Sequence, residues 1–395
     1  MLIAPPLALY IHIPWCVRKC PYCDFNSHAQ RGALPVDDYI AALLADLERD
    51  LAGHAAAVRG RSVGSIFFGG GTPSLFAADA IARILAGVAA RVDVAAGAEI
   101  TLETNPGTVE HGRFEGYLAA GVNRLSIGVQ SFDDDKLARL GRIHSAAEAE
   151  RAVKSAQDAG YANINLDLMY GLPGQTLAGA LADVDQALAL APAHLSHYQL
   201  TLEPNTVFAA RPPVLPDEDN TWDMQEACQA RLAAAGFVQY EVSAYARDGQ
   251  RCRHNLNYWT FGDYLGIGAG AHGKLSDAQG GTITRTAKVK VPHSYLARAA
   301  PGGQFGTRQT IDGAELPFEF MLNALRLVEG VPLALFADRT GVGTDAIAAR
   351  LADQRTRGWL EPDADRIQPS ALGRRFLNDV MAAWLPARAN RSTAP

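Results

Sequence analysis

The chain has 395 residues, of which 48% are hydrophobic, and its formal net charge at pH 7 is −6. That length allows about two or three domains, and the hydrophobic content is ample for a packed core. The acidic balance argues against a general nucleic-acid-binding protein. No apolar run reaches the roughly 18–20 residues of a membrane-spanning helix, so we expect no membrane span. Without a recognisable targeting segment we expect a cytoplasmic protein, associated with membranes only through its partners.

Strands and helices alternate along the first half of the chain. We predict six strands, over residues 7–13, 65–68, 98–103, 123–129, 163–169 and 195–200. Helices are predicted between them, at about 37–52, 76–91, 109–119, 146–159 and 175–190. This alternation is typical of a parallel sheet with crossover helices. Six units favour an α/β fold with a partial (β/α)6 barrel, whose site lies at the carboxyl ends of the strands.

The alternation ends after about residue 212. Prolines at 212, 213 and 216 predict a linker, before a helix over 217–234 and a Gly-rich stretch over 262–273. From residue 314 the pattern is helical again.

The last part of the chain contains segments 358–360 and 366–368, which we predict to pair as a small hairpin, and then a helix over 372–384. Helices followed by a hairpin are typical of a winged-helix module. We therefore divide the chain into a core barrel (1–212), a connecting region (213–313), a C-terminal α+β winged-helix-like module (314–386) and a disordered tail (387–395).

Three of the five cysteines fall within eight residues, at Cys16, Cys20 and Cys23. A C-x3-C-x2-C loop offers three thiolates to a [4Fe–4S] cluster and leaves one iron open. Disulfides are disfavoured, because an odd number of clustered thiols suits a reducing compartment. A structural zinc site usually takes four ligands, often as two pairs, and here Cys228 and Cys252 stand alone. We therefore predict that the three clustered cysteines hold the cluster.

This cysteine spacing, directly after a hydrophobic strand, resembles that of the radical S-adenosylmethionine (SAM) superfamily. The resemblance implies that the methionine part of SAM chelates the open iron and that the cluster can pass it one electron. The Gly-rich run 69–73 resembles the motif that holds the SAM ammonium group. Tyr22 stands where the superfamily places an aromatic ring against adenine.

A set of ordered segments resembles a narrower family, the oxygen-independent coproporphyrinogen oxidase-like proteins. The segments are 9–14, 69–73, 103–106, 124–132, 140–144, 167–173 and 254–259. The resemblance implies that SAM is surrounded by Tyr10, Gly70, Gly71, Thr72, Glu103, Gln130, Arg142 and Asp167. The residue types suit this role, because carboxylates accept hydrogen bonds from hydroxyl or ammonium groups and arginine pairs with a carboxylate.

The chain departs from the true oxidases at two points. Those enzymes carry a fourth cysteine two residues after the third, where this chain has Phe25. They also carry an extension before the first strand, which this sequence lacks. Both departures resemble the HemW-type sister group, proposed to bind haem and deliver it to haem proteins. The resemblance thus implies a haem chaperone with a [4Fe–4S] cluster, SAM and haem as cofactors.

Two other functions stay open beside the haem chaperone. One is an oxygen-independent coproporphyrinogen III dehydrogenase, so whether the protein is an enzyme is left open. The other is a regulatory or nucleic-acid-binding protein acting through its C-terminal module, and the negative charge counts against it. The partners we expect are haem, haem-accepting proteins such as respiratory enzymes, an electron donor for the cluster and a second copy in a homodimer, but no nucleic acid.

The segment that begins at His254 has the pattern HNxxYW, with Tyr258 and Trp259 at its end. A neutral imidazole is a common axial ligand of haem iron, and aromatic rings can pack on the macrocycle. The alternative is a histidine that hydrogen-bonds within a turn near the domain junction, and Cys252 is a second candidate ligand. His194 and His197, which flank the sixth predicted strand, are candidates to line the cavity.

Overall fold

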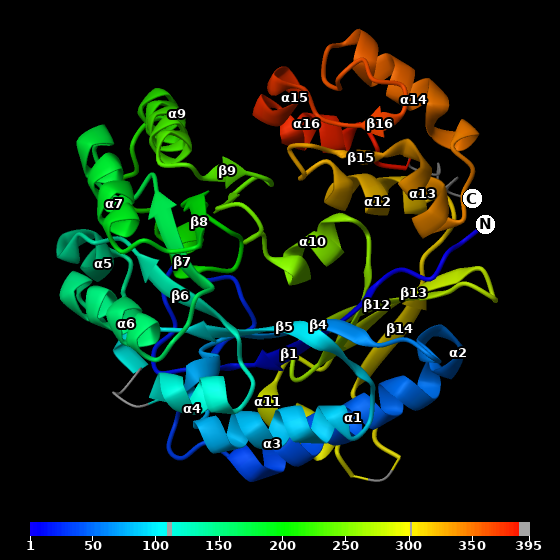
Figure 1. Cartoon of the computed structure of the whole chain (residues 1–395), viewed down its shortest axis with the longest axis horizontal. Helices are drawn as coiled ribbons and strands as arrows, with labels where there is room; N and C mark the ends of the chain where they lie inside the picture. Colours follow the sequence, from blue (N-terminus) through cyan, green and yellow to red (C-terminus); the bar gives the residue numbers. More distant parts are fainter. Residues whose placement is uncertain (109–112, 301, 387–395) are drawn as a thin grey trace, which may run out of the picture.

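The computed structural model describes residues 1–108, 113–300 and 302–386 (Figure 1). The predicted disordered tail and the first residues of the predicted helix 109–119 lie outside these ranges. The core of the molecule is a curved mixed sheet whose strands follow the order β14-β13-β12-β11-β1-β4-β5-β6-β7-β8-β10-β9. None of the helices in these ranges is both long and apolar enough to cross a bilayer.

Parallel strands form the centre of this sheet and confirm the six predicted ones. They are β1 (Leu7–Ile13), β4 (Val63–Gly70), β5 (Val94–Thr104), β6 (Arg124–Gln130), β7 (Ile164–Tyr170) and β8 (His194–Gln199). In β1 and β7 every residue but one is buried. Strands covered on both faces read as continuous apolar runs, which explains why the sequence revealed them.

The predicted crossover helices are confirmed as well, and they cover the outer face of the curved sheet (Figure 1). They are α1 (Val36–Gly53), α3 (Ala78–Ala89), α4 (Arg113–Ala119), α6 (Ala146–Asp158) and α7 (Leu177–Ala189). Local sequence fixes their ends. In α6, for example, the Ser145 hydroxyl and the Glu148 carboxylate form a reciprocal capping box.

The regular alternation of strands and helices ends near residue 212, as predicted, but the sheet does not, because later segments add strands to both of its edges. Strand β11 (Asp263–Ile267) pairs in parallel with β1. Strands β12 (His272–Asp277), β13 (Thr282–Lys288) and β14 (Gly306–Thr310) extend that edge in antiparallel fashion, and β10 (Ala244–Ala246) and β9 (Val238–Gln239) extend the other.

Strand β11 was not predicted because of its glycine content. A Cβ atom on Gly266 would lie 1.8 Å from the carbonyl oxygen of His272, so the neighbouring backbone leaves room for glycine only. Such glycines lower strand propensity and read as a loop. The same region also contains α9 (Glu218–Ala234), as predicted, and the short helices α10 (Arg253–Trp259) and α11 (Pro292–Ala297).

The C-terminal module supplies most of a second hydrophobic cluster, which includes Phe320 and Trp384 and extends to Leu2, Phe261 and Ile283 outside the module. Its helices are α12 (Leu316–Ala324), α13 (Leu333–Thr340), α14 (Asp345–Thr356), α15 (Ala371–Arg375) and α16 (Leu377–Ala382). The predicted fold class, an α/β barrel followed by an α+β module, is confirmed.

Two local predictions for this module need correction. The predicted helix 372–384 is interrupted at Phe376, whose backbone (φ −110°, ψ 36°) leaves the helical region. The strand β16 (Arg366–Ile367) pairs with β15 (Val331–Pro332) rather than with segment 358–360. That segment contributes a single bridge, between Leu360 and Pro369.

Candidate functional site

A cavity of about 730 Å³ lies where the central strands end. Strand ends supply much of its wall, as expected for a parallel barrel. Most of the predicted cluster and SAM residues line it. They are Cys16, Cys20, Tyr22, Cys23, Gly70, Gly71, Thr72, Glu103, Gln130, Arg142 and Asp167. The structure thus brings together side chains that are up to about 150 residues apart in the sequence.

Short strands close the base of the cysteine loop. The first, β2 (Trp15–Cys16), pairs in parallel with β3 (His28–Ala29). Within the loop, the Asn26 amide donates hydrogen bonds to the carbonyl oxygens of Ala269 (2.9 Å) and Lys290 (2.8 Å). The loop is therefore fastened to the part of the sheet that sequence reasoning assigned to the connecting region.

The three loop thiols are partly exposed, unlinked and directed to one cavity. Burial raises the pKa of Cys16 and of Cys23. Arg142 Nη1 lies 3.8 Å from Cys20 Sγ and donates to it. In the described ranges no three His, Cys, Asp or Glu side chains gather around a single metal position. A [4Fe–4S] cluster is held through different irons, so its thiol donors fit without converging on one point.

The Gly-rich run brings backbone rather than side chains to the cavity. Gly70 has φ +115°, a conformation that side chains rarely tolerate. A Cβ atom on Gly71 would lie 2.5 Å from the carbonyl oxygen of Trp15. The Gly71 N–H donates to Ile13 O (2.8 Å) and the Thr72 N–H to Trp15 O (2.7 Å), which fixes this run against the cysteine loop. The cradle fits a ligand that contacts main chain.

Two carboxyl groups, Glu103 and Asp167, face the same cavity. Burial, and then the charge of Asp167, raises the pKa of Glu103 to about 8, and the carboxyl accepts one bond, from the Gly70 N–H (3.2 Å). Burial also raises the pKa of Asp167. Hydrogen bonds donated by Ser126 Oγ (3.1 Å) and Asn165 Nδ2 (2.8 Å) act in the opposite direction and lower it. Two partly satisfied carboxyl groups suit a cationic ligand that carries hydroxyl groups.

Gln130 and Arg142 complete this side of the cavity. Gln130 adopts φ +72° at a bulge between β6 and β7, and its Oε1 accepts from the Tyr198 hydroxyl (2.8 Å). Left-handed backbone at a residue other than glycine costs energy and is concentrated at functional sites. Arg142 Nη2 donates to Gly128 O (2.6 Å), whereas its buried Nε has no partner among the described residues. That unpaired donor fits an anionic ligand group such as a carboxylate.

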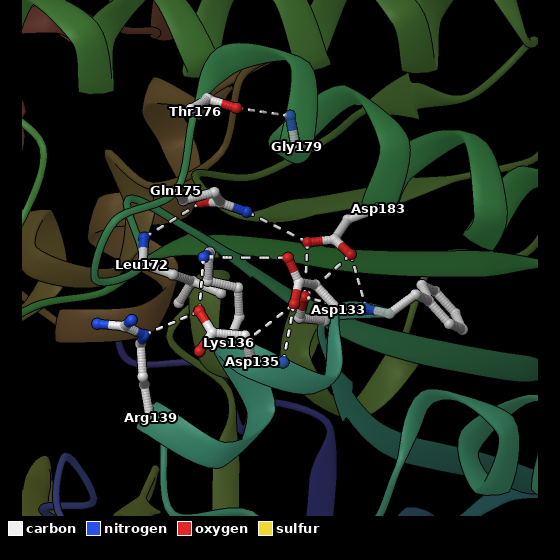
Figure 2. A network of polar contacts seen from close by, with 11 residues as sticks. Asp133, Asp135, Lys136, Arg139, Leu172, Gln175, Thr176, Gly179 and Asp183 are labelled. Atoms are coloured by element: carbon white, nitrogen blue, oxygen red, sulfur yellow. Dashed lines mark hydrogen bonds and ion pairs between the residues drawn. The ribbon is translucent and has the colours of Figure 1, made fainter.

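A buried carboxylate on α7 holds the turn that follows Gln130 (Figure 2). Asp183 accepts hydrogen bonds from Ser131 Oγ (2.8 Å), the Phe132 N–H (2.6 Å) and Gln175 Nε2 (3.2 Å). Burial raises the pKa of Asp183 to about 6. These bonds fix the residues next to the strained Gln130, so the site conformation is imposed by the surrounding fold.

Tyr10 does not line the cavity, unlike the other predicted SAM residues. Its hydroxyl is 2.9 Å from His12 Nδ1, and its ring stacks on Phe67. A Cβ atom on Gly69 would lie 3.0 Å from the Tyr10 ring. Tyr10 therefore packs behind the Gly-rich strand, where it supports the cradle.

His254 lies in helix α10 and is 1% exposed, so the alternative of a histidine in a turn near the domain junction needs correction, because the residue is helical and buried. Its Nδ1 is 3.0 Å from Ser65 Oγ and its Nε2 is 2.9 Å from the Tyr258 hydroxyl. Burial lowers its pKa to about 3. Ligation of haem iron by His254 would require one of these bonds to break. Cys252 is buried too, and its thiol lies 3.6 Å from Glu99 Oε1.

The far wall of the cavity contains residues that sequence reasoning did not single out, Glu241 and Arg326, together with Trp259 from the HNxxYW segment. Arg326 Nη2 pairs with Glu241 Oε2 at 3.2 Å, and its guanidinium lies 4.3 Å from the centre of the Trp259 ring. No local motif marks either charged residue. His194 and His197 are buried and do not line the cavity, contrary to prediction.

Comparisons with known proteins give a consistent result. The model of the radical SAM superfamily matches residues 10–187, and that of the HemN C-terminal domain matches residues 311–376. The chain is 52% identical to heme chaperone HemW of Escherichia coli K12, over 98% of this chain and all of that protein. It is 51% identical to heme chaperone HemW of Haemophilus influenzae, over 96% of this chain and 98% of that protein.

A solved structure has the same fold. Coproporphyrinogen III oxidase (HemN) from Escherichia coli, described as a radical SAM enzyme, superposes with a TM-score of 0.79 at 23% identity. The match covers 96% of this chain and 90% of that one. At this identity the likeness concerns the fold alone.

Proposed function

The chain belongs to the family of proteins named heme chaperone HemW, and from this premise we propose that it binds haem and delivers it to haem proteins. The observation that carries the proposal is the 52% identity with one such protein over 98% of this chain and all of that protein. The cavity adds physical support, because it combines the three loop thiols with aromatic side chains that can pack on a macrocycle.

The proposal includes a [4Fe–4S] cluster on Cys16, Cys20 and Cys23. When bound, such a cluster supplies a single electron to SAM. The surrounding residues hold and orient the loop: Asn26 fixes it to the sheet, and the Arg142 guanidinium donates to the Cys20 sulfur. Because clustered thiols must stay reduced to bind iron, we propose the cytoplasm as the compartment and an external protein as electron donor.

SAM is proposed to bind beside the cluster, along the strand ends. The Gly70–Thr72 backbone and Glu103 suit its ammonium group, Arg142 suits its carboxylate, and Asp167 suits its ribose hydroxyls. Tyr22 lines the same cavity and offers a ring for adenine. A homodimer is also part of the proposal.

Haem is proposed to use the aromatic part of the cavity wall. Phe25 is 59% exposed and lines the cavity next to the cysteine loop, and Trp259 lines it from α10. Aromatic faces of this kind offer apolar contact to a planar macrocycle. Phe25 occupies the place of the extra cysteine of the oxidases, which is why we do not favour the coproporphyrinogen dehydrogenase.

The experiment that tests the proposal uses the full chain, reconstituted anaerobically with iron and sulfide. In one arm haem is titrated and the Soret band is followed. In the other arm the protein is incubated with SAM, a reductant and coproporphyrinogen III, and porphyrin products are separated. We expect saturable haem binding and no decarboxylated product. Decarboxylated product without haem binding would establish the dehydrogenase instead.

A further inference from the structure

A line of buried hydrogen bonds runs from the cavity to the beginning of helix α10. Asn165 Nδ2 donates to Asp167 Oδ1 at 2.8 Å, and Asn165 Oδ1 lies 2.6 Å from His194 Nδ1. His194 Nε2 lies 2.8 Å from the Tyr240 hydroxyl, which in turn accepts the Cys252 N–H at 3.3 Å. The four residues beyond Asp167 are each at most 2% exposed.

The chemistry of these groups fixes the direction of every bond. The Asn165 amide nitrogen faces the Asp167 carboxylate, because the opposite orientation would set oxygen against oxygen. The Asn165 oxygen can only accept, so His194 carries its proton on Nδ1. Burial lowers the pKa of His194 well below its ordinary value, so the ring is neutral and its Nε2 accepts the Tyr240 proton. All donors therefore point toward Asp167.

Such an aligned series strengthens each of its bonds, because every donor is polarised by the bond behind it. Its far end bears on two parts of the molecule. Cys252 is the N-cap residue of α10, the helix that contains the HNxxYW segment. The Tyr240 carbonyl accepts the N–H of Val328, in the C-terminal module, at 3.0 Å. The series thus joins Asp167 to the N-terminus of α10 through bonds shielded from water.

We infer that Asn165, His194 and Tyr240 are positioning residues that orient Asp167 and couple a ligand held at Asp167 to helix α10. The inference rests on the proposed function, in which Asp167 binds a SAM hydroxyl group and α10 lines the part of the cavity used by haem. A hydroxyl that donates to Asp167 competes with the Asn165 amide for the carboxylate. The hydrogen bonds from His194 to Asn165 and from Tyr240 to His194 then weaken. The bond between the Tyr240 hydroxyl and the Cys252 N–H, at the N-terminus of α10, changes with them.

The test is thermodynamic. The haem dissociation constant of the anaerobically reconstituted full chain is measured with and without saturating SAM, and the SAM constant with and without haem. We expect each ligand to change the affinity of the other by at least about fivefold, and by the same factor in both directions.

The diagnostic variant is Tyr240→Phe, which keeps the ring and removes the hydroxyl that links His194 to Cys252. We call the factor by which one ligand changes the dissociation constant of the other the coupling factor, and in this variant we expect it to fall below about twofold. The SAM dissociation constant should stay within about threefold of that of the unmodified protein, because Asp167 and Asn165 are untouched. The matched control is Tyr161→Phe. Tyr161 is 4% exposed and its hydroxyl has no partner among the described residues, so its coupling factor should be unchanged.

Each outcome decides the matter. An unmodified protein that binds both ligands with a coupling factor of one overturns the inference and spares the proposed function. So does a Tyr240→Phe variant that melts at a lower temperature but keeps full coupling, because a merely structural role predicts that result. Failure of the unmodified protein to bind SAM or haem refutes the proposed function, and the inference falls with it.

Discussion

Replacement of His254 by alanine should destabilise the fold rather than remove a haem ligand. The ring bridges β4 to the end of its own helix, through Ser65 and Tyr258, and it stacks on Phe67 with 5.1 Å between ring centres. His254→Ala therefore removes one buried and one partly buried hydrogen bond and leaves a cavity in a packed region. It also leaves the Ser65 hydroxyl without this partner.

The expected loss follows from these contacts. A buried hydrogen bond contributes about 0.5–1.5 kcal/mol, and deletion of a large buried side chain costs about 2–5 kcal/mol when the cavity does not collapse. We expect the free energy of unfolding to fall by about 3–5 kcal/mol. Thermal unfolding of the apo protein, followed by circular dichroism, should show this as a clear fall in Tm.

Two matched variants make the experiment decisive. His272→Ala changes an exposed histidine of β12 and should leave the Tm unchanged. Ser65→Ala removes only the bond to Nδ1, and should lower stability by about 1 kcal/mol with an unaltered Soret spectrum. A His254→Ala protein with unchanged Tm and a lost or shifted Soret band would refute this reasoning and restore His254 as the axial ligand.

The other predictions concern the cluster and SAM. Replacement of all three loop cysteines by alanine should abolish iron and sulfide uptake on anaerobic reconstitution. The control Cys228→Ala, at a buried core position, should retain both. A full cluster in the triple variant would contradict the assignment. Asp167→Ala should keep the cluster but weaken SAM binding, measured by calorimetry, by roughly tenfold to more than a hundredfold, since it loses a hydrogen bond to a charged group worth about 1.5–3 kcal/mol. In the folded protein the pKa of Glu103 is raised from 4.5 to about 8. Its contribution to the free energy of unfolding is therefore complete below pH 4.5 and is lost as the pH rises toward 8. The Tm advantage of Glu103→Gln over the unmodified apo protein should therefore grow between pH 5 and pH 8, and an advantage independent of pH would count against a buried, protonated Glu103.

The central barrel could be predicted from the sequence for a physical reason. Strands such as β1 are covered on both faces, so their whole length is apolar, and helices such as α6 carry their caps in the local sequence. The SAM residues were identified through the resemblance to the coproporphyrinogen oxidase-like proteins. The sequence placed Gly70, Glu103 and Asp167 near the carboxyl ends of predicted strands, and parallel strands end together at one edge of a sheet.

Long-range packing explains what the sequence could not reveal. Strand β11 depends on glycines that read as a loop until the neighbouring backbone is seen. The pair of Glu241 and Arg326 joins the sheet to the C-terminal module and has no local pattern. His254 stands in a segment of polar and aromatic residues, and its hydrogen-bond partner Ser65 lies nearly two hundred positions earlier in the chain.

The central claim, that the protein binds haem in order to deliver it, is tested most directly by haem transfer. The anaerobically reconstituted chain is loaded with haem, freed of excess by gel filtration and mixed with the apo form of a b-type cytochrome. The two proteins are then separated and their haem is quantified. We predict that haem moves to the cytochrome faster than it dissociates into a solution containing a neutral haem scavenger. Transfer no faster than this free dissociation would contradict the claim.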